Sequence, residues 1–382
     1  MNNILRLVFS FVSLGVLLSA PTTDAVTKTG ERVADYETKE ELSRTEDEMR
    51  DIYSEFLSLL PPDISALGEG FSGTGGIVEL LEVLAAPLSD SIDELSGTLL
   101  LCLFICILMC LCELLLADNG ELYVTARGAL SIILTFPVIG VMGQLLSSVI
   151  GGIREASGFF SEVLPLISSV IAIGVGGGTA AASAAGMSVT LGFVEGVICD
   201  NLYLIFTAVF ALSVIGNLDT GQGGGGVARG FRSCYTFLLG AVSLILGGTL
   251  ALGTALTASR DTLALRSAKY VISGMVPVVG GIVSGSIGAL LSGARLLSGA
   301  IGALGVIAIV YYMAVPLISL LAFRLCLGVC IMFSGFTSSS LASKFFEALR
   351  GSIDCLIAPL AYSLIIYVLE LALFSVTVGA VR

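Results

Sequence analysis

The sequence contains no histidine and no tryptophan in 382 residues. Without histidine, the chain cannot form Ser-His-Asp or Cys-His nucleophile arrangements, or the zinc sites that use histidine ligands. Charged residues are also scarce, at 13% of the chain, against about 25% in typical soluble domains. These absences argue against an enzyme of the common hydrolase classes and against a water-soluble domain.

Apolar residues make up 55% of the chain, and its mean hydropathy is +1.00. A soluble core could not bury this much apolar surface, so the lipid bilayer is the expected environment. From residue 98 onward, the apolar segments approach the roughly 20 residues that cross a bilayer as a helix. The candidate segments are 98–117, 128–152, 161–177, 187–215, 233–257, 271–293, 296–321, 325–342 and 353–381.

These segments predict an all-α, polytopic membrane domain over residues 98–382, with about seven or eight transmembrane helices. The stretch GVGGGTAAASAAG is short and rich in glycine, and segment 271–293 contains a proline and several glycines. We therefore expect one or two segments to be re-entrant or to lie at the membrane surface. Lysine and arginine occur in almost every predicted loop, so the positive-inside rule leaves the topology open.

The net negative charge is concentrated in one region. Residues 26–97 contain 17 Asp and Glu against 5 Lys and Arg, which gives −12, and the rest of the chain contains 13 of each sign. An acidic exposed region argues against nucleic-acid binding, which requires Lys and Arg to neutralise phosphates. The chain is therefore expected to join an acidic, water-facing region to a neutral membrane domain.

Residues 1–25 have the layout of a secretory signal peptide. Arg6 precedes an apolar run, and small and polar residues then lead to an expected cleavage point after Ala25. An uncleaved membrane anchor is the alternative. In either case, residues 26–97 are expected to form an acidic extracytoplasmic helical region.

A helix is predicted within this acidic region. Apolar residues recur at helical spacing over residues 49–60, Thr38-x-x-Glu41 matches a capping box at the start, and Pro61-Pro62 stops the helix. A second amphipathic stretch comes after a glycine-rich linker. Neither helix can bury a large core alone, so both are expected to pack on the membrane domain or on a partner.

The nine cysteines all lie in or beside apolar segments, so no disulfide framework is expected. Cys102, Cys106 and Cys110 recur every four residues, which places them on one helical face. We interpret them as a packing stripe, because buried thiols are usually inert. The glycine-rich run 218–227 lacks the Gly-Lys pair of a P-loop. No catalytic residue, metal or cofactor is predicted.

Two charged residues within apolar segments are candidates for function. Glu370 lies near the middle of the last apolar run, where a carboxylate is costly unless it is paired or neutral. Arg295 and Arg324 are candidate partners. The alternatives are a structural ion pair, a protonated buried carboxyl, and a role in ion or proton movement.

Arg295 also falls on a strip of small residues with helical spacing, which allows another helix to approach closely. The strip can serve packing within one subunit, packing between subunits, or the lining of a passage. Its members are Gly274, Gly281, Gly285, Gly288, Ser292, Gly299 and Gly302.

The most unusual stretch is SRDTLALRSAKYVISGMVPVVGG, residues 259–281. Its cations are expected to hold a short helix at the membrane surface, and its proline and glycines are expected to break or bend the adjoining apolar segment. The candidate docking and hinge residues are Asp261, Leu265, Arg266, Lys269, Pro277 and Gly280. This stretch resembles the signature region of the stage III sporulation protein AE family.

The resemblance implies a multi-pass protein of the mother-cell membrane around the forespore. Members of the family act with the other stage III A proteins, which include an ATPase and ring-forming subunits, and with stage II sporulation protein Q. The implied function is that of a membrane platform or pore subunit in a channel, or feeding tube, needed for endospore formation. The resemblance leaves open whether the protein forms homo-oligomers. The rival hypothesis is a secondary transporter of a small solute or ion that uses discontinuous Gly/Pro helices and Glu370.

Overall fold

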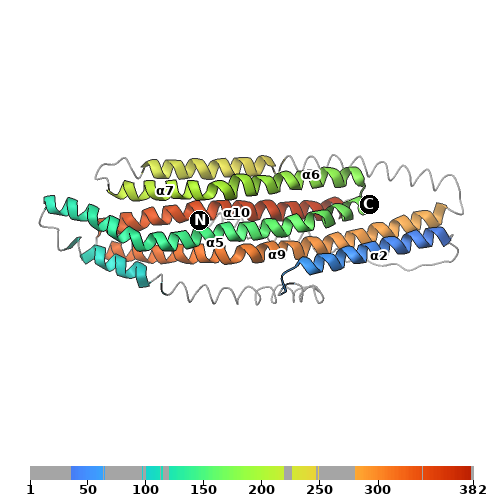
Figure 1. The fold of residues 1–382 in the computed structure, drawn as a ribbon, viewed down its shortest axis with the longest axis horizontal. Helices are drawn as coiled ribbons and strands as arrows, with labels where there is room; N and C mark the ends of the chain where they lie inside the picture. Colours follow the sequence, from blue (N-terminus) through green and yellow to red (C-terminus); the bar gives the residue numbers. More distant parts are fainter. Residues whose placement is uncertain are drawn as a thin grey trace.

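The long helices of the protein lie side by side along one axis (Figure 1). A computed structural model describes residues 36–62, 64, 97, 100–111, 113–114, 120–218, 226–246, 248, 280–337 and 339–379. Every regular element in this part of the chain is a helix, which confirms the all-α prediction. Four of the described helices are long and apolar enough to cross a membrane. The total number of crossings stays a prediction.

The signal peptide, the second amphipathic stretch and most of residues 259–281 lie outside the described residues. The elements are α2 (Tyr36–Leu59), a short apolar helix (Leu100–Leu111), α5 (Gly120–Gly174), α6 (Gly177–Phe193), the π-helix η1 (Val194–Cys199), α7 (Asp200–Leu218), a helix over residues 226–246, α9 (Gly280–Phe336) and α10 (Ser340–Gly379).

Helix α10 is the central element of the bundle. In the apolar part of α10, 78% of the residues are buried, against 33% in the corresponding parts of α5 and of α6–α7. It packs most extensively on α9 and also contacts α5 and α7. Its buried side chains include Tyr367, whose hydroxyl lies 2.5 Å from Ser157 Oγ of α5. The core therefore forms around α10.

The sequence predicted separate crossings over 128–152 and 161–177, but α5 runs unbroken through the first and into the second as far as Gly174. The polar residues between them do not interrupt the helix, because Arg154 and Glu155 lie on its exposed face. Charged residues at a helix surface leave the backbone hydrogen bonds intact, so a short charged stretch in an apolar sequence does not by itself mark the end of a helix.

Segments 296–321 and 325–342 were also expected to be separate, and α9 joins them as far as Phe336. The reason is Arg324, which is partly buried and forms an ion pair with Asp354 of α10 instead of marking a loop. Arg232, from the helix over residues 226–246, lies 3.9 Å from the same carboxyl group. One aspartate thus links three helices, as expected where charges are partly removed from water.

The turn from α5 to α6 requires a glycine. Gly176 has φ 139°, a conformation that residues with a Cβ rarely adopt. The N–H groups of Val175 and Gly176 both donate to the carbonyl of Ile171, which closes the end of α5. Two antiparallel helices are therefore joined by a tight connection in the middle of the glycine-rich stretch that the sequence left uncertain.

Helices α6 and α7 continue into one another through the π-helix η1. The wider turn frees backbone carbonyls, and Asn201 Nδ2 donates to the carbonyls of Gly196 (3.0 Å) and Val197 (3.1 Å). π-helical turns are rare and often occur at functional positions. Here the π-helical turn joins α6 and α7 without ending the helix.

The predicted helix of the acidic region is confirmed in α2, which ends at Leu59 before the two prolines. The predicted cap is wrong, because Thr38 already lies inside the helix. As expected, α2 packs on the membrane domain: Phe56 is fully buried, and Met49 lies against Gly293 of α9. Burial of this apolar face explains how a helix with so many acidic residues is held on the bundle.

The three cysteines of the short apolar helix face α9. Cys106 Sγ lies 3.5 Å from the carbonyl of Cys330, and Cys110 Sγ lies 3.0 Å from Thr337 Oγ1. Cys102 is also buried. The shared face predicted from their spacing is therefore confirmed as a packing surface.

Two adjacent glycines of α5 provide a test of the packing between α5 and α9. A Cβ at Gly152 would lie 2.7 Å from Pro316 Cγ and 3.0 Å from the carbonyl oxygen of Tyr312, whereas a Cβ at Gly151 would meet nothing within 4 Å. We expect Gly152→Ala to lower the free energy of unfolding by about 1–3 kcal/mol through overpacking. Gly151→Ala should be neutral or stabilise by up to about 1 kcal/mol. Thermal unfolding of the two variants in the same detergent measures the difference, and equal midpoints would contradict the close approach.

Candidate functional site

The residues predicted from the stretch 259–281 fall mostly outside the described part of the chain. Gly280 is the first described residue of α9. The docking role of the stretch stays a prediction. The candidates that lie outside the described residues are Asp261, Leu265, Arg266, Lys269 and Pro277.

Glu370 is the most unusual polar residue of the described core. It lies on α10, its side chain is only 2% exposed, and neither carboxyl oxygen has a hydrogen-bond partner among the described residues. Arg324 pairs with Asp354, and the Nε and Nη2 atoms of Arg295 are themselves buried without a partner in this part of the chain. The structure therefore brings neither candidate arginine into a salt bridge with Glu370.

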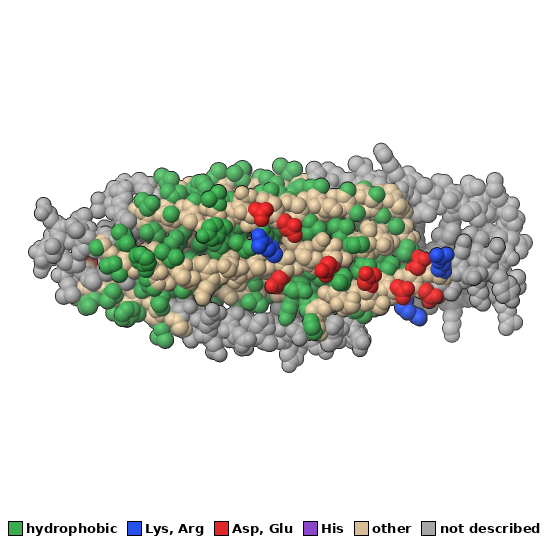
Figure 2. All heavy atoms as spheres, in the orientation of Figure 1, with side chains coloured by type: hydrophobic (Ala, Val, Ile, Leu, Met, Phe, Trp, Pro, Cys, Tyr) green, Lys and Arg blue, Asp and Glu red, His purple; other side chains and the backbone are tan. Residues whose placement is uncertain are grey.

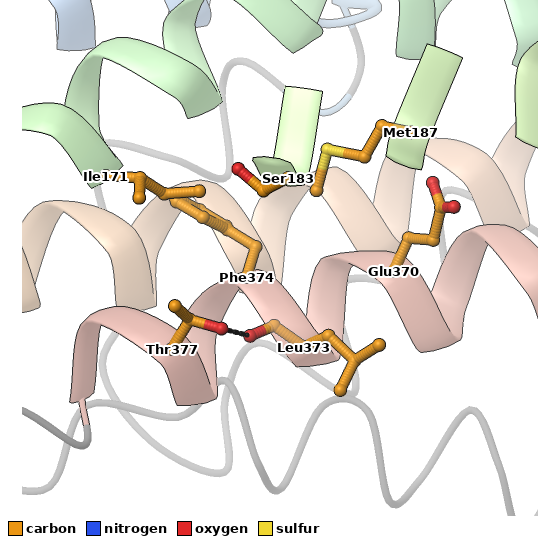
Figure 3. A pocket seen from close by; sticks show the side chains of 7 residues that line it. All are labelled: Ile171, Ser183, Met187, Glu370, Leu373, Phe374 and Thr377. Carbon is orange, nitrogen blue, oxygen red and sulfur yellow. Dashed lines mark hydrogen bonds between the residues drawn. The ribbon is translucent and has the colours of Figure 1, made fainter. Parts of the chain in front are cut away.

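A small cavity lies beside the Glu370 carboxyl group, where α5, α6 and α10 meet (Figure 3). Its volume of about 20 Å³ is enough for one water molecule. Ser183 and Met187 of α6 lie across the cavity from α10, so the carboxyl group points toward another helix and not along its own. The lining residues are Ile171, Ser183, Met187, Glu370, Leu373, Phe374 and Thr377.

The hydroxyl groups around this carboxyl group already donate their protons to backbone carbonyls. The bonds are Ser183 Oγ to Ala180 O (2.9 Å), Thr377 Oγ1 to Leu373 O (2.7 Å) and, for the neighbouring Thr190, Oγ1 to Gly186 O (3.3 Å). A hydroxyl has one proton to donate and two lone pairs that accept. In this arrangement these groups present lone pairs to the cavity, and each would have to give up its backbone hydrogen bond to donate to the carboxylate, which Thr190, with the longest of these bonds, can do most readily.

The chemistry of the site results from the absence of a hydrogen-bond partner for the Glu370 carboxyl group among the described residues. An unsatisfied buried polar group costs about 1–3 kcal/mol, and more when it is charged. A single water, a proton or a small cation in the cavity would remove that cost, because each supplies the positive end that the carboxyl group lacks. The arrangement suits reversible binding of one of these species. It contains no nucleophile and base pair that would support covalent catalysis.

Sequence reasoning found Glu370 but missed the facing residues of α6. Five residues of that helix are buried, and four of them, all except Ala180, are spaced four, four and three residues apart, which is one helical face. Three of the four carry hydroxyl groups in a helix otherwise rich in glycine and alanine, and this was the available signal. The four are Thr179, Ser183, Met187 and Thr190.

Comparison with known proteins agrees with the resemblance drawn from residues 259–281. The family model described as stage III sporulation protein AE matches residues 68–378, which include the cavity and all of α5 to α9. Helix α2 precedes the matched region. Neither a curated protein nor a solved structure matches the chain. Because the match covers most of the sequence, the chain belongs to the stage III sporulation protein AE family.

Proposed function

We propose that this sporulation protein is a multi-pass membrane subunit of the channel complex between mother cell and forespore, acting as a membrane platform or pore component. The observation that carries the proposal is the family match over residues 68–378, together with four helices suited to a membrane. The expected location is the mother-cell membrane around the forespore. The expected partners are the other stage III A proteins, including the ATPase and the ring-forming subunits, and stage II sporulation protein Q.

The packing of the bundle favours a platform over a pore through one copy. The centre of the described bundle is occupied by α10, whose large apolar side chains include the fully buried Tyr367 and Phe374. A water-filled passage through the middle of a single copy would require water to replace the neighbours that now pack against α10. A passage formed between copies, or with partner subunits, needs no such rearrangement, so we assign the platform role first and any pore to the assembly.

Co-purification from sporulating cells tests the proposal. A tagged copy that replaces the native gene should bring down the ATPase and the ring-forming subunits, and deletion of the gene should abolish heat-resistant spores. Changing Arg266 and Lys269 together to Ala should weaken recovery of the partners while the protein stays in the membrane fraction, if this stretch docks a partner. The matched control is Arg50→Ala with Lys344→Ala, two exposed cations outside the stretch. Normal spores after deletion, with no partners recovered, would refute the proposal.

Glu370 supports the second candidate function, a secondary transporter of a small solute or ion. Its buried carboxyl group, without a partner among the described residues and beside a cavity for one water, is the kind of site that such a transporter uses. The platform proposal needs no titrating or ion-binding group at this position.

The isosteric change Glu370→Gln distinguishes the two functions. Under the platform proposal, the variant should form spores at close to the wild-type level, because the amide keeps the shape and removes only the charge. Under the transporter hypothesis, spore formation should be lost although the partners still co-purify. Glu347→Gln, on the exposed face of the same helix, controls for loss of an acidic side chain from α10. Loss of spores in Glu370→Gln alone would overturn the preference for a platform.

A further inference from the structure

The four apolar helices are much longer than a bilayer is thick. Their lengths are 40, 40, 45 and 37 residues, over Thr135–Gly174, Gly177–Gly216, Ser292–Phe336 and Ala342–Val378. At 1.5 Å per residue, 40 residues extend about 60 Å, twice the roughly 30 Å of the hydrocarbon core. A tilt of 40°, the upper end of the usual range, would still leave about 46 Å along the membrane normal. The bundle must therefore extend beyond the hydrocarbon.

Helix α2 identifies the part of the bundle that lies in water. It runs along the first part of α9 (Figure 1), with Met49 against Gly293. Placing a charged side chain in hydrocarbon costs about 2.5–3.5 kcal/mol for each residue. The part of α9 that lies beside α2 is therefore outside the bilayer. Over residues 44–59 of α2, the exposed acidic residues are Glu46, Asp47, Glu48, Asp51 and Glu55.

The exposed large apolar side chains gather on the other half of the bundle, as the space-filling view shows on one face (Figure 2). They belong to residues 100–114, the first part of α5, α7, the helix over 226–246 and the second part of α9. The exceptions are Val189, Val197, Leu296 and Val376. On the half that carries α2, the exposed residues of α6 are instead mostly glycine, alanine and serine.

A row of exposed charges separates the two halves. This charged belt begins at Arg154, Glu155 and Asp200, and its other members, Glu195 and Glu162, follow about 8 and about 12 Å further toward the half that carries α2. Arg154 Nη2 lies 3.8 Å from Asp200 Oδ1, so the middle of α5 and the start of α7 are at one level. Tyr312 lies close to this level, with its ring centroid 6.0 Å from that of Phe159, and the exposed Tyr203 comes one turn after Asp200. Tyrosine is enriched where membrane meets water, so the belt fits a membrane boundary.

The length of α7 supports this boundary independently. From Asp200 to Leu218 it contains 19 residues, which extend about 28 Å and therefore match one hydrocarbon core. From Tyr312 to its end at Phe336, α9 likewise provides a single crossing. Along α7, the belt and the Leu218 end are thus separated by about the thickness of one hydrocarbon core.

We propose that the bilayer surrounds only the half of the bundle between the charged belt and the Leu218 end, and that the other half projects into the aqueous space outside the cytoplasm. The partner of the apolar half is lipid. The projecting half contains α2, α6, the second part of α5, the first part of α9 and the end of α10. The inference does not depend on the proposed function, because the position of the bilayer rests on helix length, charge and exposure, and the direction of the projection rests on the predicted N-terminal segment.

The direction of the projection is set by the chain order. The N-terminal segment predicted as a signal peptide or anchor places α2 outside the cytoplasm, and α2 packs on the projecting half. Arg229 and Lys344 lie toward the opposite end of the bundle, as expected for the cytoplasmic side.

Glu370 and Arg295 were predicted as intramembrane charges, and this placement puts them outside the hydrocarbon. Tyr367 contacts Ser157 at the level of the belt, and Glu370 lies about one helical turn beyond it on the side of α6. The cavity beside Glu370 then belongs to the projecting half. Its carboxyl group is shielded by neighbouring helices and not by lipid.

The absence of tryptophan makes the depth of single positions measurable. We would introduce one tryptophan at a time, at the exposed positions Phe237 and Leu325 in the apolar half and Val189 and Leu296 in the projecting half. The full chain is reconstituted in vesicles of lipid with brominated acyl chains, which quench tryptophan fluorescence on contact. Phe237→Trp and Leu325→Trp should lose most of their emission, whereas Val189→Trp and Leu296→Trp should keep it and be quenched by iodide in water.

The two alternatives, a bundle embedded along its whole length and an apolar half covered by protein, each give a distinct result in this experiment. Strong quenching by brominated lipid at Val189→Trp and Leu296→Trp would show that the whole bundle is embedded and would overturn the proposal. Emission retained at Phe237→Trp and Leu325→Trp would show that protein covers the apolar half, and this would overturn it as well. Each variant is first compared with the parent chain by thermal unfolding. Val376→Trp, also exposed in the projecting half, replaces any variant there that does not fold.

A reporter at the C-terminus tests the direction of the projection. Gly174 lies against Val378 and Ala294, so α10 ends at the projecting half. Alkaline phosphatase, which is active only outside the cytoplasm, should be active when fused after Arg382. The same reporter inserted within residues 219–225, between the two helix ends at the opposite end of the bundle, should be inactive. An inactive C-terminal fusion that is present at the wild-type level would overturn the extracytoplasmic projection.

Discussion

The thickness of the hydrocarbon core is the constraint on which the rest of this structure depends. A helix of 40 residues exceeds that thickness about twofold, so the same helix must present different surfaces along its length. The first part of α5 exposes Ile133 and Phe136, and its second part exposes Ser161 and Glu162. The change of surface within one unbroken helix is what allows one bundle to meet lipid in one half and water in the other.

The charged groups of the bundle differ in how they are accommodated, and their burial decides which solution applies. Arg154 and Asp200 are more than half exposed, so their 3.8 Å contact is worth little in stability. Arg324 and Asp354 are mostly buried and need each other, because removal of either would leave a charge without a partner. Glu370 has neither solvent nor a partner among the described residues, and this is why it, among the charged residues of the described core, is the candidate for binding something.

The sequence was most informative where a local pattern decides the structure. The helical spacing of α2, its stop at Pro61 and the shared face of Cys102, Cys106 and Cys110 depend on neighbours in the chain, and all were predicted. The continuity of α5 and α9 depends on tertiary contacts, such as the pair formed by Arg324, and could not be read from composition. The position of α6 opposite Glu370 likewise depends on two segments that are far apart in the sequence, and local patterns do not place them together.

The same geometry bears on the choice between a platform and a transporter. Alternating access uses helices that are broken near the middle of the bilayer, where the substrate is bound. Within the described part of the chain, the helices that contribute to the apolar half run unbroken through it, and the π-helical turn of η1 lies at the charged belt. The cavity beside Glu370 is small and lies beyond that belt. A bundle whose helices run unbroken through the membrane, and are joined there by the cluster of Arg232, Arg324 and Asp354, is better suited to hold partner proteins in position than to move a solute.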